Sequence, residues 1–381
     1  MRAYRALTWD HPRGYNALAA AAAQIDPSRD GIAIHWDKQS LEGFESHPIA
    51  DLCARYDLVV LDHPHVGEAV ANQCLLALED VFGEATLAEL EAATIGPCLS
   101  SYRFGDRHWA LPLDAAAQVV AARVDRLGRD LPTTWDEVIA LSRATGEVAL
   151  SLAGPHAFVS LLSMWRAFVE IDANRDEDSI LAGEAGRHAY EVLRELSARS
   201  PLSIAGNNPI GILGHMARHE DVALCPLIFG YVTYAAPNSG TALRFANAPR
   251  ARPGGRPGSV LGGTGIGISR RCEVTPELRR HLLWLLDEES QTTFIPAHDG
   301  QPSRRSAWQD GRVNARWGNF YRDTAETLEA AYVRPRYAGF VSFASRASDY
   351  VRDALSNRTS ATEALGALNK MYLASRTGFG V

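Results

Sequence analysis

The stretch FGDRHWALPLDAAAQ, residues 104–118, marks the point at which the chain divides. Its first four residues predict a tight turn, because a Gly-Asp pair tolerates the backbone angles of a hairpin tip, and a short strand follows at residues 108–111. Pro112 cannot donate a hydrogen bond to a sheet, so we expect Leu111–Asp114 to be a stiff extended crossing rather than a strand interior. A new apolar run starts at Ala115, and the crossing therefore predicts a hinge between two lobes.

Length and composition indicate a globular protein with two domains. At 381 residues the chain exceeds what one hydrophobic core usually serves. The net charge of −7 argues against nucleic acid as a partner, because phosphate binding requires a concentrated basic face. A disulfide framework or a zinc knuckle is not expected, because no CxxC spacing occurs among the five cysteines, Cys53, Cys74, Cys98, Cys225 and Cys272.

The start of the chain bears on localisation. After Met1 the sequence enters the strand-like residues 3–9 without an apolar stretch of signal-peptide length. As written, this predicts a cytoplasmic protein, whereas a biological start upstream of Met1 would predict a periplasmic one. Polar residues and Pro155 interrupt the most apolar later region, residues 148–169, which favours a buried strand and helix over membrane insertion.

Strands and helices alternate in the first part of the chain. Tyr4–Trp9 and Gly31–Trp36 predict strands, and Tyr56–Asp62 is the clearest buried strand because it is short, apolar and β-branched. The polar loops Asp10–Tyr15 and Asp62–Gly67 follow two of these strands. This alternation predicts a doubly wound α/β lobe, in which ligands bind beyond the carboxyl ends of the strands, and both histidine-bearing loops lie at that edge.

The second half contains weaker signals. Leu131–Glu137 predicts the start of a helix, with a threonine cap before Trp135 and acidic residues in the first turn. Glu147–Leu152 and Asp221–Cys225 predict short strands, and the aromatic residues of the segment that follows Cys225 suit a cleft. The glycine-dense residues 254–269 lack the lysine and hydroxyl residue of a phosphate-binding loop. We interpret them as a second crossing between lobes, where glycine lets the backbone approach a ligand closely.

With these signals in this order, the sequence resembles the extracellular solute-binding proteins of ABC importers, specifically the branch that binds maltose-type and other sugars. The resemblance covers nearly the whole chain. It rests on Thr8-Trp9, Tyr56–Val60, Phe104-Gly105-Asp106 before Ala110-Leu111-Pro112, Pro132–Glu137, Asp221–Gly230, Gly262–Ser269 and a helix that ends at Gln291.

The resemblance implies a type II periplasmic-binding-protein-like fold of two doubly wound α/β lobes that close on a ligand by hinge bending. The implied N-terminal lobe consists of residues 1–111 and 262–308, the C-terminal lobe of 115–258 and 312–381, and the hinge crossings of 112–114, 259–261 and 309–311. The implied ligand contacts are Trp9, Asp10, His11, Tyr15, Asp62, His63, Asp114, Phe229, Tyr231, Gly262 and Gly263. Carboxylates accept hydroxyl hydrogen bonds in pairs, and aromatic faces pack on the apolar side of a pyranose, so this set suits a sugar.

Two further interpretations concern the histidines and Cys225. Imidazole and carboxylate together suit zinc or iron, and such a set exists in His11, His63, His65, Asp10, Asp62 and Asp114. We favour structural and hydrogen-bonding roles, because Asp-His-Pro turns often serve to close loops, and we expect no metal and no cofactor. Cys225 is interpreted as a buried apolar residue rather than a nucleophile.

The leading hypothesis is a monomeric solute-binding protein that captures a small polar molecule, a sugar or sugar derivative, without altering it. An ABC permease is an expected partner only for an exported protein. The alternative is a cytoplasmic lyase, isomerase or hydrolase on the same fold, with His11, His63 and Asp114 as candidate catalytic residues. A third hypothesis is a cytoplasmic ligand sensor that presents its closed form to a partner protein.

Overall fold

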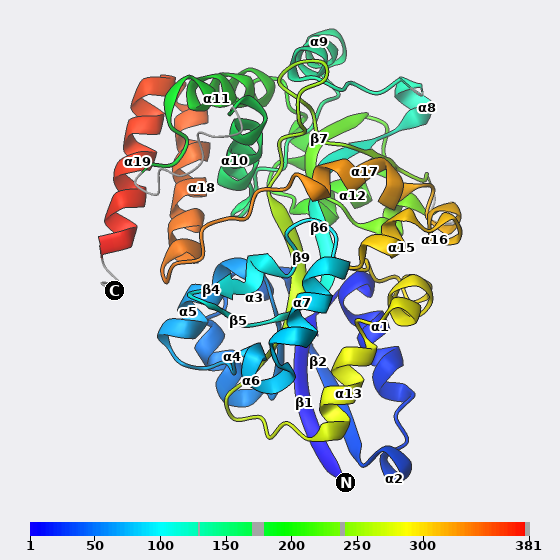
Figure 1. Ribbon diagram of the computed structural model, residues 1–381. Helices are drawn as coiled ribbons and strands as arrows, with labels where there is room; N and C mark the ends of the chain where they lie inside the picture. Colours follow the sequence, from blue (N-terminus) through cyan, green and yellow to red (C-terminus); the bar gives the residue numbers. More distant parts are fainter. Residues whose placement is uncertain (129, 170–178, 237–240, 378–381) are drawn as a thin grey trace. The chain divides into compact units, whose positions relative to one another are not determined.

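The computed structural model describes residues 1–128, 130–169, 179–236 and 241–377 (Figure 1). The chain forms two compact units. Unit 1 comprises Met1–Ala116, Gly262–Arg316 and Arg334–Ala338, and unit 2 comprises Ala117–Leu261, Trp317–Val333 and Gly339–Val381. The lobe boundaries expected from the sequence stay a prediction.

Unit 1 is built on a sheet whose first three strands are parallel. β1 (Arg2–Trp9) pairs with β2 (Ile32–Gln39) on one side and with β3 (Leu58–Leu61) on the other. β3 pairs antiparallel with β9 (Leu261–Ile268), and β6 (Leu111–Ala122) is the next strand in the sheet. The carboxyl ends of β1, β2 and β3 therefore share one edge, as predicted.

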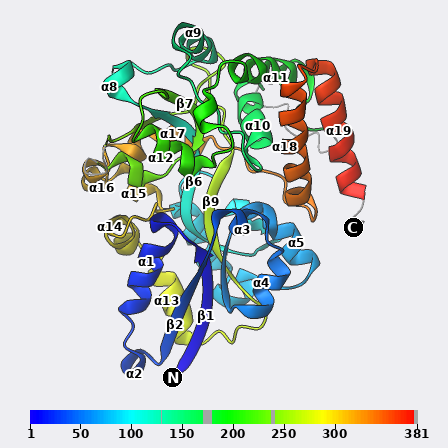
Figure 2. The ribbon, with the colours of Figure 1, turned by 180° about the vertical axis from the view of Figure 1, so that it is seen from behind.

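Helices cover both faces of this sheet. On one face, Tyr4 and Val60 pack in a cluster with residues of α1 (Pro12–Ala23) and α13 (Pro276–Trp284). On the other face, Leu7, Val59 and Leu61 pack with residues of α4 (Ile49–Arg55) and α5 (Val66–Ala71). Figures 1 and 2 show these helix pairs on opposite sides of β1. The doubly wound arrangement predicted for the first lobe is confirmed.

The other elements of unit 1 are short. The predicted tight turn is confirmed as the tip of a hairpin formed by β4 (Arg103–Phe104) and β5 (Arg107–His108). The remaining helices and helical turns are α2 (Pro27–Asp30), α3 (Leu41–Ser46), η1 (His63–His65), α6 (Leu78–Phe82), α7 (Glu84–Ala93), η2 (Ser100–Tyr102), η5 (Ser290–Phe294), α14 (Ile295–Ala297), α15 (Arg305–Gln309) and α16 (Gly311–Arg316).

Unit 2 contains the carboxyl-terminal part of β6, with which β7 (Leu224–Phe229) and β8 (Arg244–Ala246) pair antiparallel. The predicted cap of α9 is confirmed, because Thr134 and Glu137 form a reciprocal capping box. The helices are α8 (Val124–Leu127), α9 (Trp135–Thr145), α10 (His156–Phe168), α11 (Gly183–Ser197), η3 (Leu202–Ile204), α12 (Pro209–Met216), η4 (Val232–Ala235), α17 (Phe320–Glu329), α18 (Phe340–Ser356) and α19 (Ala361–Thr377). None of the helices in the described part of the chain is long and apolar enough to cross a membrane.

The prediction that Leu111–Asp114 would not be a strand interior is wrong, because β6 runs unbroken through Pro112. The N–H and C=O groups of one strand residue face the same side. The carbonyl of Pro112 accepts a hydrogen bond from the Ser303 hydroxyl, so its missing N–H faces the irregular segment around Ser303 rather than β9. Proline is tolerated at such a position because no regular ladder requires its N–H.

Two strand predictions in the second half are also wrong in detail. Glu147–Leu152 forms only an isolated bridge, between Val148 and Leu224. The strand expected at Asp221–Cys225 starts at Leu224 and continues through Pro226. The pairing of β6 with β7 shifts register opposite this proline, and such a bulge accommodates a residue that cannot donate to the ladder.

Candidate ligand-binding site

The loop after β1 is fixed by a close contact between a tryptophan and a helix. Trp9 is buried, and its indole ring packs against Phe44 with the ring centroids 5.3 Å apart. A Cβ atom on Gly14 would lie 2.4 Å from the same indole ring, so only glycine allows α1 to start this close to β1. Of the expected ligand contacts, Trp9 is therefore also a packing residue.

The next residues of this loop carry polar groups at two levels of burial. His11 caps α1, and its Nδ1 atom accepts a hydrogen bond of 3.1 Å from the backbone N–H of Arg13. Burial, and then the nearby charge of Arg13, lower the pKa of His11 to about 4. The side chain of Asp10 is 60% exposed and forms an ion pair of 2.7 Å with Lys38, whose ammonium lies 4.8 Å from the centre of the Tyr15 ring.

Asp114 forms a buried ion pair with Arg13. The guanidinium donates to both carboxylate oxygens, with a distance of 2.9 Å from Nε to Oδ2. Burial raises the pKa of Asp114, and the charge of Arg13 opposes that rise. Such a bidentate pair fixes the orientation of both groups. Asp114, in β6, thus lies beside the loop that follows β1. Arg13 connects the two, and sequence reasoning did not select this arginine.

The loop after β3 holds a second ion pair. The Arg334 guanidinium donates to Asp62 Oδ2 at 2.5 Å, and the backbone N–H of Arg334 donates to His63 Nε2 at 3.2 Å. Burial alone would raise the pKa of Asp62, but the charge of Arg334 and the hydrogen bonds that Arg334 and His63 donate to the carboxylate hold it well below its usual range. Burial and the charge of Arg334 lower the pKa of His63 to about 4. His63 is therefore neutral at pH 7 and acts as an acceptor.

Segment Arg334–Ala338 is anchored to unit 1 by a second arginine as well. The Arg336 guanidinium donates to the carbonyl groups of Ser100, Ser101 and Arg103, at 2.9, 3.0 and 2.6 Å. The backbone of Arg336 also passes so close to α5 that a Cβ atom on Gly67 would lie 1.7 Å from the Arg336 carbonyl oxygen. Both arginines were missed by sequence reasoning, because nothing near them marks a partner some 230 or more residues away.

Gly262 and Gly263 lie at the start of β9, next to β6. Gly263 has a φ of +88°, and a Cβ atom there would lie 2.3 Å from the backbone oxygen of Asp114. Only glycine fits here, because the backbone of β9 passes close to the backbone of β6; the predicted close approach of this backbone to a ligand stays a prediction. Next to it, the buried hydroxyl of Thr264 makes no hydrogen bond within the described residues. Such a hydroxyl can be satisfied by a water molecule or by a hydroxyl group of a ligand.

Phe229 and Tyr231 belong to unit 2. Phe229 ends β7, and its ring meets that of His156 edge to face with the centroids 5.9 Å apart. Tyr231 is buried. Cys225, in the same strand, is fully buried, and burial raises the pKa of its thiol to about 12. This confirms the interpretation of Cys225 as a buried apolar residue.

The candidate metal ligands are not brought together. Within the ranges that the structure describes, no three histidine, cysteine, aspartate or glutamate side chains are placed to hold a metal ion. The two acids of this set that are largely buried already have other partners, because Asp114 forms an ion pair with Arg13 and Asp62 forms one with Arg334.

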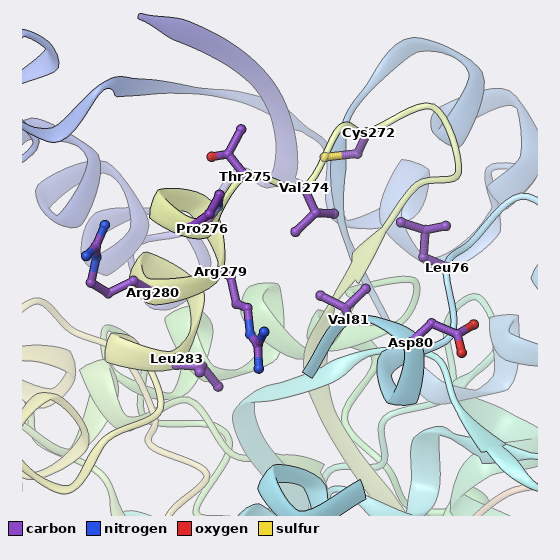
Figure 3. Close-up of a pocket in the computed structure, with 10 residues that line it drawn as sticks. All are labelled: Leu76, Asp80, Val81, Cys272, Val274, Thr275, Pro276, Arg279, Arg280 and Leu283. Carbon is purple, nitrogen blue, oxygen red and sulfur yellow. The ribbon is translucent and has the colours of Figure 1, made fainter. Parts of the chain in front are cut away.

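A hollow of about 640 Å³ lies elsewhere on unit 1, between α6 and α13 (Figure 3). Cys272 and Val274 in its wall follow the carboxyl end of β9, which is antiparallel to β3. Thr275, also in the wall, accepts a hydrogen bond from Tyr4 near the start of β1. The hollow therefore lies at the amino-terminal edge of β1 and β3, opposite the loops that carry His11 and His63.

The fold is that of a known class of binding protein. The chain is similar over 98% of its length to an ABC transporter solute-binding protein of Agrobacterium radiobacter K84 in complex with ribitol, with 98% of that chain covered, 20% identity and a TM-score of 0.77. Its structure is also similar to maltose-bound MalE3 of T. maritima (98% and 99% covered, 17% identity, TM-score 0.79) and to a solute-binding protein of Thermotoga lettingae TMO bound with α-D-tagatose (98% and 100% covered, 14% identity, TM-score 0.80).

The chain thus has the type II periplasmic-binding-protein fold expected from the sequence. No protein-family model matches the sequence, and the comparison with curated proteins found no match.

Proposed function

We propose that this protein is a solute-binding protein that captures a small, neutral, hydroxyl-rich molecule, a sugar or a sugar alcohol, and releases it unchanged. The observation that carries the proposal is the fold, which the chain shares over nearly its whole length with proteins whose structures contain ribitol, maltose or α-D-tagatose. The polar loops of unit 1 lie beyond the carboxyl ends of its parallel strands, where open α/β sheets bind ligands.

The charges at this edge of unit 1 favour a neutral ligand. Asp114 is balanced by Arg13 and Asp62 by Arg334. Because the pKa values of His11 and His63 are about 4, both imidazoles are uncharged at pH 7. An anionic or cationic ligand would find no surplus of opposite charge among these groups, whereas hydroxyl groups would find fixed donors and acceptors.

The same observations give no support to catalysis by His11, His63 or Asp114. A general base works best with a pKa near the operating pH, and both histidines lie well below it. The acceptor atom of His63 is already used by the backbone of Arg334, and both oxygens of Asp114 are used by Arg13.

The proposed partner depends on the compartment. A binding protein of this type located outside the inner membrane would deliver its ligand to an ABC permease, and one inside the cell would hold its ligand for another purpose. Fractionation of source cells, with sequencing of the mature N-terminus in each fraction, decides between these cases.

A ligand screen by thermal shift tests the proposed function. We expect pentitols, hexoses or maltooligosaccharides to raise the unfolding midpoint, and amino acids and dicarboxylates to leave it unchanged. Within a hit series, Thr264→Val should weaken binding because it removes the unpartnered buried hydroxyl, and Thr264→Ser should retain it. Stabilisation by charged solutes alone, with none by sugars or polyols, would overturn the proposal.

A further inference from the structure

The five cysteines of this chain differ in their surroundings, although all five are free thiols. Cys225 and Cys272 are buried, and burial raises the pKa of each thiol to about 12, which makes them poor nucleophiles. Cys53 and Cys74 differ from them because they form a pair.

Cys53 and Cys74 meet on the face of the unit 1 sheet that α4 and α5 cover. Cys53 lies in α4, and Cys74 follows α5, which packs against α4. Cys53 is a buried member of the apolar cluster on this face, and Cys74 is a partly exposed residue that packs against the same cluster. The two thiols are close enough that each shifts the pKa of the other. The Cys74 Sγ atom also lies 3.5 Å from the carbonyl oxygen of Ala69.

The two thiols are chemically unequal. Cys74 is partly exposed, whereas Cys53 is buried. The neighbouring thiol of Cys53 lowers the pKa of Cys74, and the thiol of Cys74, together with burial, raises the pKa of Cys53. Thiolate, rather than thiol, is the attacking species in disulfide exchange, and it must also be accessible. Cys74 is the accessible thiol of the pair and the one whose pKa is lowered, and Cys53 is the buried thiol that completes the reaction.

We propose that Cys53 and Cys74 are a modification site that forms a reversible intramolecular disulfide by exchange with a small-molecule disulfide. The Cys74 thiolate attacks one sulfur of that molecule, so a mixed disulfide forms and one thiolate leaves. The Cys53 thiol gives its proton to that thiolate, and its sulfur attacks Cys74 Sγ, which releases the second thiolate to take a proton from water at its own pKa. Two protein thiols are oxidised, and one small disulfide is reduced to two thiols.

The bridge would join α4 to the end of α5, whose other end begins directly after the His63–His65 turn. A covalent link at this place restrains the unfolded chain between residues 53 and 74, so the oxidised protein should unfold at a higher temperature than the reduced one. The inference is independent of the ligand and of the proposed function.

The experiment treats the reduced full-length protein with glutathione disulfide. After an acid quench and unfolding, we expect the titratable thiols to fall from five to three, because the bridge consumes two of the five cysteines. A peptide map without reductant should show one linked pair that contains Cys53 and Cys74, and dithiothreitol should restore five thiols.

Variants separate the two roles. Cys53→Ala should stop the reaction at the mixed disulfide, with one glutathione retained on Cys74, and Cys74→Ser should abolish the reaction. Cys225→Ser, a change at a buried thiol outside the pair, should still form the bridge. Retention of all five thiols, a stable mixed disulfide on the unaltered protein, or a bridge that involves another cysteine or a second chain would each overturn the proposal.

Discussion

The loops after β1 and β3 both begin Asp-His-Pro, at Asp10–Pro12 and Asp62–Pro64, yet their aspartates have opposite environments. The side chain of Asp10 is 60% exposed and pairs with Lys38 from the neighbouring strand. The side chain of Asp62 is 19% exposed and pairs with Arg334, which is 272 residues away. The same local sequence therefore gives a solvated surface pair in one loop and a largely buried charge in the other.

The histidines of the two loops differ less. Each accepts a hydrogen bond from the backbone N–H of an arginine, His11 from Arg13 and His63 from Arg334. Each is kept neutral by burial and by that arginine. In both loops the Asp-His-Pro tripeptide forms a turn in which the histidine accepts a hydrogen bond. How much the aspartate contributes to stability depends instead on its ion-pair partner, which lies elsewhere in the chain.

The largest effect is expected from Arg334→Ala, which leaves Asp62 largely buried without its counter-ion. Removal of one partner of a buried pair typically costs about 3–5 kcal/mol of the free energy of unfolding. Urea unfolding at pH 7 measures it. The double variant Arg334→Ala/Asp62→Ala should recover part of the loss, because it also removes the orphaned charge. A loss below about 1 kcal/mol in the single variant would show that Asp62 is solvated like Asp10.

A smaller loss is expected from Gly67→Ala, because the new Cβ atom would lie 1.7 Å from the backbone oxygen of Arg336. Overpacking of this kind costs about 1–3 kcal/mol. Amide hydrogen exchange should rise at residues 334–338, since the methyl group pushes that segment off α5. Gly366→Ala in α19 is the matched control: apart from its chain neighbours and the backbone of its own helix, nothing lies within 4 Å of its Cβ position, so it should not destabilise. Equal exchange in both variants would contradict the anchoring of this segment.

The histidines predict a pH dependence shared by both loops. Their pKa values lie near 4 in the folded protein and near the ordinary value of 6.5 in the unfolded chain, so the unfolded chain takes up protons first as the pH falls. Stability should be constant above pH 6.5 and decline as the pH falls from 6.5 toward 4.

Variants that keep an acceptor but cannot titrate test this dependence. In His63→Gln and His11→Asn, the unfolding free energy should fall less steeply over this range than in the unaltered protein. Urea unfolding at several pH values between 7.5 and 4.5 measures the slopes. Unchanged slopes in both variants would mean that neither histidine is buried in its neutral form.

The smallest effect is expected from Lys38→Ala, which removes the partner of the exposed Asp10. Surface ion pairs of this kind contribute about 0–1 kcal/mol, and the change should vanish at high salt. The loss of unfolding free energy in Lys38→Ala should be measured in the same urea series as that in Arg334→Ala. The difference between the two losses then measures how differently the two loops bury their aspartates. A loss as large as that of Arg334→Ala would remove the contrast altogether.

Local patterns in the sequence predicted several elements of both units. The β-branched run of β3, the hairpin tip at Gly105 and the Thr134 cap are each specified by a few adjacent residues, and all three are present. The edge at which His11 and His63 lie followed from the strand directions alone.

The features that the sequence did not predict depend on partners that are distant in sequence. A proline signals a strand end only when a ladder needs its N–H, and at Pro112 and Pro226 the neighbouring strand does not. The roles of Asp62 and Asp114 depend on Arg334 and Arg13, which are 272 and 101 residues away. Arg13 at least belongs to a polar loop, Asp10–Tyr15, that the sequence had already marked as a candidate for ligand binding. Arg334 carries no such local signal.

Titration calorimetry with a sugar or polyol from the ligand screen, followed by recovery of the ligand, tests the central claim most directly. We expect saturable binding at one ligand per chain and recovery of the same compound, unaltered by nuclear magnetic resonance after prolonged incubation. No heat with any neutral sugar or polyol, or recovery of a converted product, would contradict the account of this protein as a solute-binding protein.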